Sequence, residues 1–216
     1  LTGPIIAPIT LPGDVTIYEP NMASSVSGLK TGRHARVCLD RKKMFRAQIR
    51  AIYRASIYGN LSIMYPMITS MREVEEIWKI VSEVKESLSQ REIPYKDIPN
   101  GIMVETPAAA MIIPELAQKA DFISLGTNDL TQYVLAMDAQ NPQLEKKFDR
   151  HHPAVLRMME MVIKATHEAG KKVLVCGELA AEKAMIPYFL KLNVDALSMA
   201  PACILPARKA VRNLDL

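Results

Sequence analysis

Two short apolar segments of the sequence each run into a carboxylate. Glu105 directly follows residues 101–104, and Asp129 comes shortly after residues 122–125. Apolar segments of this length, rich in Ile and Val and bounded by Gly and Pro, are typical of buried parallel strands. The carboxyl ends of such strands are where α/β proteins bind ligands, and carboxylate oxygens are ligands that Mg²⁺ prefers. The sequence therefore predicts that Glu105 and Asp129 hold one metal ion, which in turn holds the substrate.

Each carboxylate also has an ordinary structural alternative. Asp129 could cap the N-terminus of a helix, and Glu105 could pair with an arginine. Two neighbouring carboxylates also suit general acid–base catalysis, although no glycosidase-like context accompanies them.

Other side chains with chemical potential are a cysteine and two arginines. Cys176 stands between the apolar residues 173–175 and Gly177. It is either a buried structural thiol or a general acid or nucleophile that faces a pocket. Arg33 and Arg36 precede or begin a basic helical segment, so they could reach a phosphate or a carboxylate. Cys38 and Cys203 are expected to be structural, and the four histidines lack metal-ligand spacing.

Strands and helices that could position these residues alternate from residue 61 onward. Strands are expected over residues 61–65, 101–104, 122–125, 173–175 and 196–199. A helical pattern follows each strand, over residues 74–88, 108–120, 129–137, 179–192 and 205–214, and Pro153 and Gly170 bound another helix. Ser70 and Glu73 form a capping box, and Gly59 has the position of a helix C′ residue.

Five consecutive strand–helix units predict a parallel sheet covered by helices. The fold class is α/β, and we expect a (β/α)₈ TIM barrel, either complete or incomplete at the N-terminus, with a doubly wound open sheet as the alternative. The polar residues after each strand favour the barrel, because its strand ends surround one pocket. Residues 33–216 are expected to form the barrel domain. Residues 1–32 would be its N-terminal part or a flanking segment.

Composition limits the class of protein. The 216 residues are 49% hydrophobic and 23% charged, with a formal net charge of +4. A mild positive charge suits an anionic small molecule and does not by itself indicate nucleic acid. No apolar stretch reaches about 18 residues, so no membrane helix is expected. Three widely spaced cysteines suggest no disulfide framework, and a cytoplasmic location fits best.

Three motifs resemble the C-terminal phosphoenolpyruvate-binding barrel of phosphoenolpyruvate-protein phosphotransferase, Enzyme I of the bacterial sugar phosphotransferase system. They span residues 101–109, 124–133 and 176–180, with the sequences GIMVETPAA, SLGTNDLTQY and CGELA. Residues 46–52 and 63–68 match as well. The resemblance covers roughly residues 33–214.

This resemblance implies a (β/α)₈ barrel that binds phosphoenolpyruvate and Mg²⁺. It assigns Glu105 and Asp129 as metal ligands, Asp129 with Asn128 and Arg33 as substrate-binding residues, and Cys176 as the acid that protonates the enolpyruvate carbon. It also implies phosphate transfer to a histidine on a separate domain, a phosphocarrier protein as partner, and a homodimer.

Two departures from the family pattern affect the expected substrate binding. The family has an arginine where this chain has Ala139, and a second arginine expected near residues 6–11 is missing. Each lost charge-assisted contact would cost about 1.5–3 kcal/mol, or one to two decades in affinity. The missing arginines leave open a degenerate barrel that acts in dimerisation or regulation. A second alternative is a Mg²⁺-dependent aldolase or lyase of the pyruvate-enolate type, which shares carboxylates at strand ends.

Overall fold

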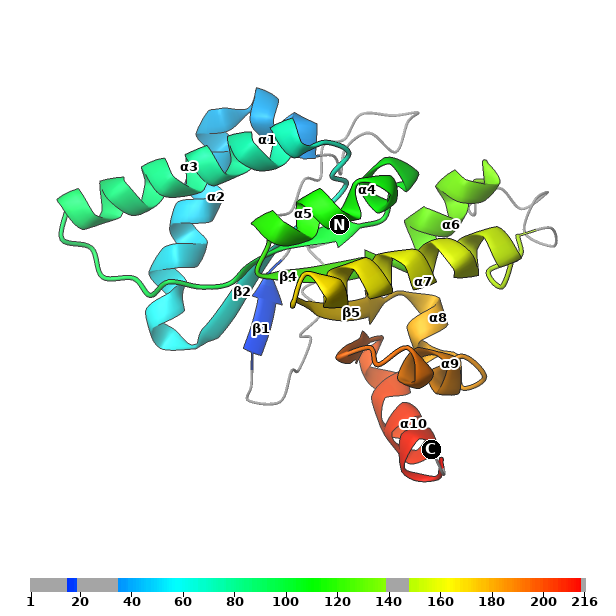
Figure 1. Ribbon diagram of the computed structural model, residues 1–216. Helices are drawn as coiled ribbons and strands as arrows, with labels where there is room; N and C mark the ends of the chain where they lie inside the picture. Colours follow the sequence, from blue (N-terminus) through cyan, green and yellow to red (C-terminus); the bar gives the residue numbers. More distant parts are fainter. Residues whose placement is uncertain (1–14, 19–34, 139–147, 215–216) are drawn as a thin grey trace. The chain divides into compact units, whose positions relative to one another are not determined.

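A computed structural model describes residues 15–18, 35–138 and 148–214 of the chain (Figure 1). Contacts within the chain divide it between Ile102 and Met103 into two compact units. Each unit combines parallel strands with helices, so the predicted α/β class is confirmed. No helix in these ranges is long and apolar enough to cross a membrane.

The first unit contains the start of the parallel strand pattern. Its elements are β1 (Val15–Tyr18), α1 (Ala35–Asp40), α2 (Lys42–Ala55), the 3₁₀ helix η2 (Ser56–Tyr58), β2 (Asn60–Tyr65), α3 (Met71–Gln90) and the first residues of β3 (Asn100–Val104). Strand β2 pairs in parallel with β1 and with β3, and Met64 lies opposite Gly101.

Helix α3 begins as the sequence predicts. The Ser70 hydroxyl accepts from the Glu73 backbone N–H, and the Glu73 carboxylate accepts from the Ser70 N–H. Its buried apolar residues keep helical spacing, and α3 packs on α2. Arg46 of α2 donates to the Glu83 carboxylate of α3, and this hydrogen bond lowers the pKa of Glu83.

The prediction for Gly59 is wrong. Helix α2 ends at Ala55 and continues as η2, so Gly59 follows the 3₁₀ turn with an extended backbone at φ −172°. An extended residue does not close a helix in the left-handed manner of a C′ glycine. Gly170 has φ +69° after α7 and does fit that role.

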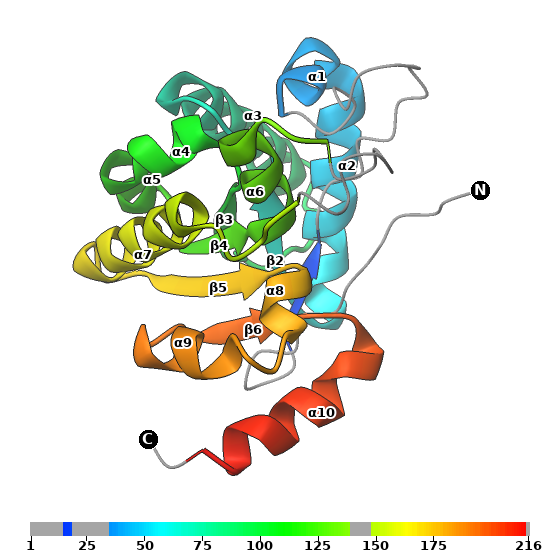
Figure 2. The same cartoon turned by 90° about the vertical axis from the view of Figure 1, so that its right-hand side faces the viewer.

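The second unit carries most of the predicted site. Its elements are α4 (Pro107–Met111), α5 (Ile113–Lys119), β4 (Phe122–Gly126), α6 (Thr127–Leu135), α7 (Pro153–Glu168), β5 (Lys172–Cys176), α8 (Glu178–Ala181), α9 (Ile186–Lys191), β6 (Ala196–Ser198) and α10 (Pro201–Arg212). Strand β5 pairs in parallel with β4 and β6. Helix α7 packs on β4 and β5, and Figure 2 shows it running along β5.

Two expected helices are each divided in the second unit. The segment 108–120 breaks at Ile112, so that Pro114 lies in the first turn of α5. The segment 179–192 likewise becomes α8 and α9, with Pro187 in the first turn of α9. Proline is tolerated there because its missing N–H would have no helical partner.

Candidate functional site at the carboxyl ends of the strands

The second unit brings four of the predicted site residues to the carboxyl ends of its strands. Glu105 comes directly after β3, and Cys176 is the last residue of β5. Asn128 and Asp129 lie in the first turn of α6, directly after β4. Gly126, Cys176 and Ser198 are register partners, so β4, β5 and β6 all reach one edge.

The Glu105 side chain packs against Gly126. Glu105 is only 4% exposed. A Cβ atom at Gly126 would lie 2.8 Å from Glu105 Cβ and 3.0 Å from its Oε2. Glycine therefore leaves the space that this carboxylate occupies at the end of β4. Because Gly126 is also the N-cap residue of α6, the carboxylate lies close to the helix start, which favours negative charge.

Asp129 does not cap its helix. The N-cap position of α6 belongs to Gly126, so Asp129 is the third residue of the helix. Its Oδ1 accepts a hydrogen bond from Gln132 Nε2 over 2.9 Å, and the residue is partly exposed. The capping alternative is wrong because α6 begins at Thr127, two residues earlier than the periodicity indicates.

Two hydrogen bonds join the β4–α6 corner to the β5–α8 corner. Thr127 Oγ1 donates to the Cys176 carbonyl over 3.0 Å, and the Glu178 N–H donates to Asn128 Oδ1 over 3.2 Å. With the oxygen of Asn128 engaged in this way, its amide nitrogen has no partner within the described ranges. The two N–H groups of that nitrogen can donate to an anion.

Gly177 makes this close approach possible. Its φ is +117°, and a Cβ atom there would lie 2.3 Å from Thr127 Oγ1 and 3.0 Å from Asn128 Oδ1. No side chain fits between the two corners, and an L-residue rarely adopts this backbone conformation.

Cys176 carries a partly exposed thiol, whereas Cys38 is buried. Its Sγ accepts a hydrogen bond from Ser124 Oγ over 3.6 Å. The thiol thus lies at the rim of the sheet, where a ligand at the strand ends could reach it.

Several contacts at this edge were not predicted from the sequence. Ser124 and Thr127 belong to the matched SLGTNDL motif, yet nothing in their types signals contact with Cys176. Arg150 pairs with Glu178 at 2.8 Å and lies over the Phe148 ring at 5.3 Å. This arginine brings a cation beside the β5–α8 corner.

Arg33, Ala139 and residues 6–11 lie outside the described residues. The expected role of Arg33, and the effect of the two missing arginines, stay predictions.

The chemistry of Glu105 and Asp129 fits a magnesium ion that is coordinated partly by the protein and partly by the substrate. Across the described ranges, no group of three or more His, Cys, Asp or Glu could hold a metal. Mg²⁺ in phosphate-handling sites is often bound by one or two carboxylates, with substrate oxygens and water completing its shell. Glu105, which is buried, and Asp129, in the first turn of α6, could supply such a pair.

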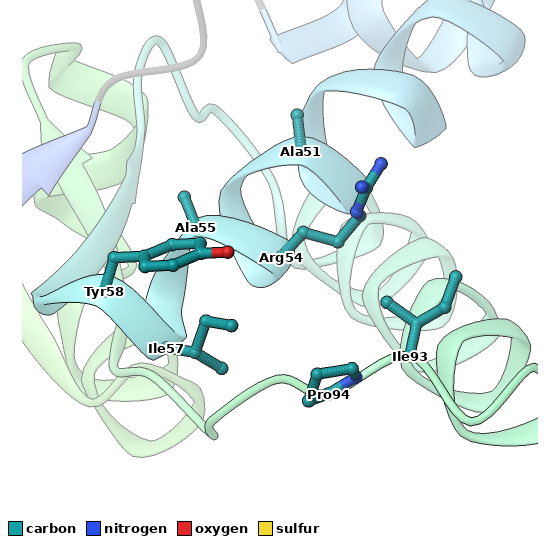
Figure 3. A pocket seen from close by; sticks show the side chains of 7 residues that line it. All are labelled: Ala51, Arg54, Ala55, Ile57, Tyr58, Ile93 and Pro94. Carbon is teal, nitrogen blue, oxygen red and sulfur yellow. The ribbon is translucent and has the colours of Figure 1, made fainter.

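A separate pocket of about 420 Å³ lies in the first unit (Figure 3). Apolar atoms of α2, η2 and the segment after α3 line most of it, and Arg54 and Tyr58 add polar groups. None of the predicted site residues contributes to it.

Comparison with known proteins shows the family. The family described as "PEP-utilising enzyme, PEP-binding domain" matches residues 28–216. The chain belongs to this family. The phosphoenolpyruvate (PEP)-binding domain is 40% identical over 212 residues to a phosphoenolpyruvate-protein phosphotransferase of Priestia megaterium, and 38% identical over 212 residues to that of Bacillus subtilis. The resemblance seen in the motifs is confirmed.

The matched region is only part of these relatives. Each of the two alignments covers 98% of this chain but 37% of the relative. The PEP-binding domain therefore spans little more than a third of the curated proteins that it matches.

Solved structures show the likeness of fold. A citrate lyase from Burkholderia xenovorans superposes with a TM-score of 0.58 at 23% identity, covering 79% of this chain and 54% of its own. A pyruvate kinase from Pyrobaculum aerophilum superposes with a TM-score of 0.55 at 13% identity. The match covers 91% of this chain and 42% of the kinase chain.

Proposed function

We propose that this PEP-binding domain is the catalytic domain of a phosphoenolpyruvate-protein phosphotransferase. It would transfer phosphate from PEP to a histidine on a separate domain and release pyruvate. The observation that carries the proposal is the meeting of Glu105, Asn128, Asp129 and Cys176 at one sheet edge, in a chain 40% identical to such an enzyme.

Glu105 and Asp129 would hold Mg²⁺ at this edge. The bound ion would neutralise charge on the carboxylate and phosphate of PEP. The start of α6 adds the positive end of a helix dipole, and the Asn128 amide can donate to a phosphate oxygen. Arg33 would supply a further charge-assisted contact to the substrate. These groups position the reactants, which is the larger part of what phosphoryl transfer needs from a protein.

Cys176 would act as the general acid. Loss of the phosphoryl group leaves the enolate of pyruvate, which needs one proton at its methylene carbon. A thiol at the end of β5, directly before Gly177, can supply it.

The same proposal includes the closure of the parallel strands into a barrel. Residues 33–216 would form a (β/α)₈ barrel domain, to which residues 1–32 would contribute an N-terminal part or a flanking segment. The alternation of strands and helices after residue 60 supports a barrel, as does the likeness to pyruvate kinase. A phosphohistidine domain and a phosphocarrier protein would be its partners, in the cytoplasm, and a homodimer its assembly.

Pyruvate release tests the function. The domain is mixed with a purified phosphohistidine domain of a relative, PEP and Mg²⁺, and pyruvate is measured with lactate dehydrogenase. We expect release that requires all components and is lost in Cys176→Ala. PEP binding without any release would instead favour the degenerate barrel that acts in regulation.

A further inference from the structure

The hydroxyl group of Ser124 lies beside the sulfur atom of Cys176. Ser124 Oγ donates to Cys176 Sγ over 3.6 Å, and Ser124 is fully buried in the middle of β4. Strand register places Gly126 opposite Cys176 and Ser124 opposite Leu174. Because side chains alternate along a strand, Ser124 and Cys176 lie on the same face of neighbouring strands.

We propose that Ser124 is the residue that positions Cys176 for proton donation. Its O–H would hold the sulfur at the sheet edge and stabilise the thiolate left after the proton has moved. This inference rests on the proposed function of Cys176 as the acid.

The hydrogen bond from Ser124 has its largest effect during the proton transfer from Cys176. The S–H bond of Cys176 breaks, and a C–H bond forms at the methylene carbon with the electron pair of the enolate double bond. The enolate oxygen becomes the ketone oxygen of pyruvate, so the negative charge moves to the sulfur. A hydrogen bond to an ionised acceptor is roughly twice as strong as one to a neutral acceptor. Ser124 therefore stabilises the product side of this step more than the starting thiol, and that difference accelerates the step.

Ser198 provides a matched control. It ends β6 and is the register partner of Cys176 on the other side, so the two hydroxyl residues flank the same strand. Ser198 is also buried, at 8% exposure. Its hydroxyl makes no hydrogen bond within the part of the chain that the structure describes.

Thiol reactivity tests the hydrogen bond without any substrate. The protein reacts with dithiodipyridine, and labelling of Cys176 is followed by peptide mass spectrometry with Cys203 as the internal reference. Loss of a charge-assisted hydrogen bond lowers the thiolate population by about one to two decades. A more basic thiolate is also a better nucleophile, which offsets roughly half of that change. We therefore expect Ser124→Ala to slow labelling about three- to tenfold.

Two further variants decide between a specific and a general effect. Ser124→Thr keeps the hydroxyl and should react within about twofold of the parent protein, as should Ser198→Ala. An unchanged rate in Ser124→Ala overturns the proposal, as does equal slowing in Ser198→Ala. Circular dichroism of each variant establishes that it is folded before its rate is compared.

Turnover separates this inference from the proposed function. In the pyruvate assay, Ser124→Ala should lower kcat about ten- to hundredfold and leave KM for PEP unchanged. Parent-like kcat in Ser124→Ala overturns the role of Ser124, although the function stands. Slowed labelling of Ser124→Ala in a protein that never releases pyruvate overturns the proposed function instead, while supporting the contact.

Discussion

At the scale of single residues, Gly126 determines where the Glu105 carboxylate can lie. Gly126→Ala places a methyl group 2.8 Å from Glu105 Cβ and 3.0 Å from Oε2. The backbone of Gly126 is at φ −84°, which alanine adopts freely, so the expected effect is steric. We expect a loss of about 1–3 kcal/mol of stability from overpacking. We also expect the thermal stabilisation by PEP with Mg²⁺ to disappear, and differential scanning fluorimetry measures both.

Gly59→Ala is the control for that substitution. Nothing lies within 4 Å of a Cβ atom there, so the change should alter stability by less than about 0.5 kcal/mol. Full ligand-induced stabilisation in Gly126→Ala would show that the Glu105 carboxylate does not need its present place.

The types of these residues could be recognised in the sequence, but their contacts could not. Apolar segments that end at Glu105 and before Asp129 are visible to periodicity, and their positions at strand ends follow from it. The hydrogen bond from Ser124 to Cys176 depends on the register of β4 against β5. Register depends on which strand faces are buried and on the connection between the strands. Because β4 and β5 are connected through α6 and α7, the residues of neither strand alone signal it.

At the scale of elements, the corner between β5 and α8 is fixed by Gly177. Gly177→Ala combines a strained backbone at φ +117° with a Cβ atom 2.3 Å from Thr127 Oγ1. Gly170→Ala shares a positive φ of +69° but meets nothing within 4 Å. Urea denaturation should show a loss of about 1–2 kcal/mol for Gly170→Ala. The loss for Gly177→Ala should be larger by about 1–3 kcal/mol because of the added overpacking.

A double variant tests whether the overlap with Thr127 causes the loss of stability in Gly177→Ala. Thr127→Ala removes the Oγ1 atom that the new methyl group meets. Combined with Gly177→Ala, it should recover part of the lost stability. Equal losses for Gly177→Ala and Gly170→Ala would mean that the two corners can separate without cost, contrary to the close packing proposed for the site.

Helix starts were harder to predict than strands. Apolar periodicity detects the buried stripe of a helix, whereas its first turn is decided by capping and by proline. Thus α10 begins at Pro201, ahead of the expected Leu205. Helix α6 begins at Thr127, which changes Asp129 from a candidate cap to a residue inside the helix. That shift of two residues bears directly on what the carboxylate can bind.

At the scale of the whole molecule, strand–helix alternation was enough to predict the α/β class. The repeated order of short apolar strands and amphipathic helices is a property of the sequence, and it survives in the elements from β2 to α10. A closed barrel is a different matter, because closure depends on strand tilt and stagger. The domain also spans only 37% of the length of the Priestia megaterium relative. Its partners are therefore proposed and not shown.

The proposed function depends most on one metal ion that Glu105 and Asp129 would hold together with PEP. Calorimetric titration with PEP, with and without Mg²⁺, tests it directly. We predict that affinity rises at least about tenfold with Mg²⁺. We further predict that Glu105→Gln loses this gain while Glu182→Gln, whose carboxylate pairs with His151, keeps it. Equal PEP affinity with and without Mg²⁺ in the parent protein would contradict the account.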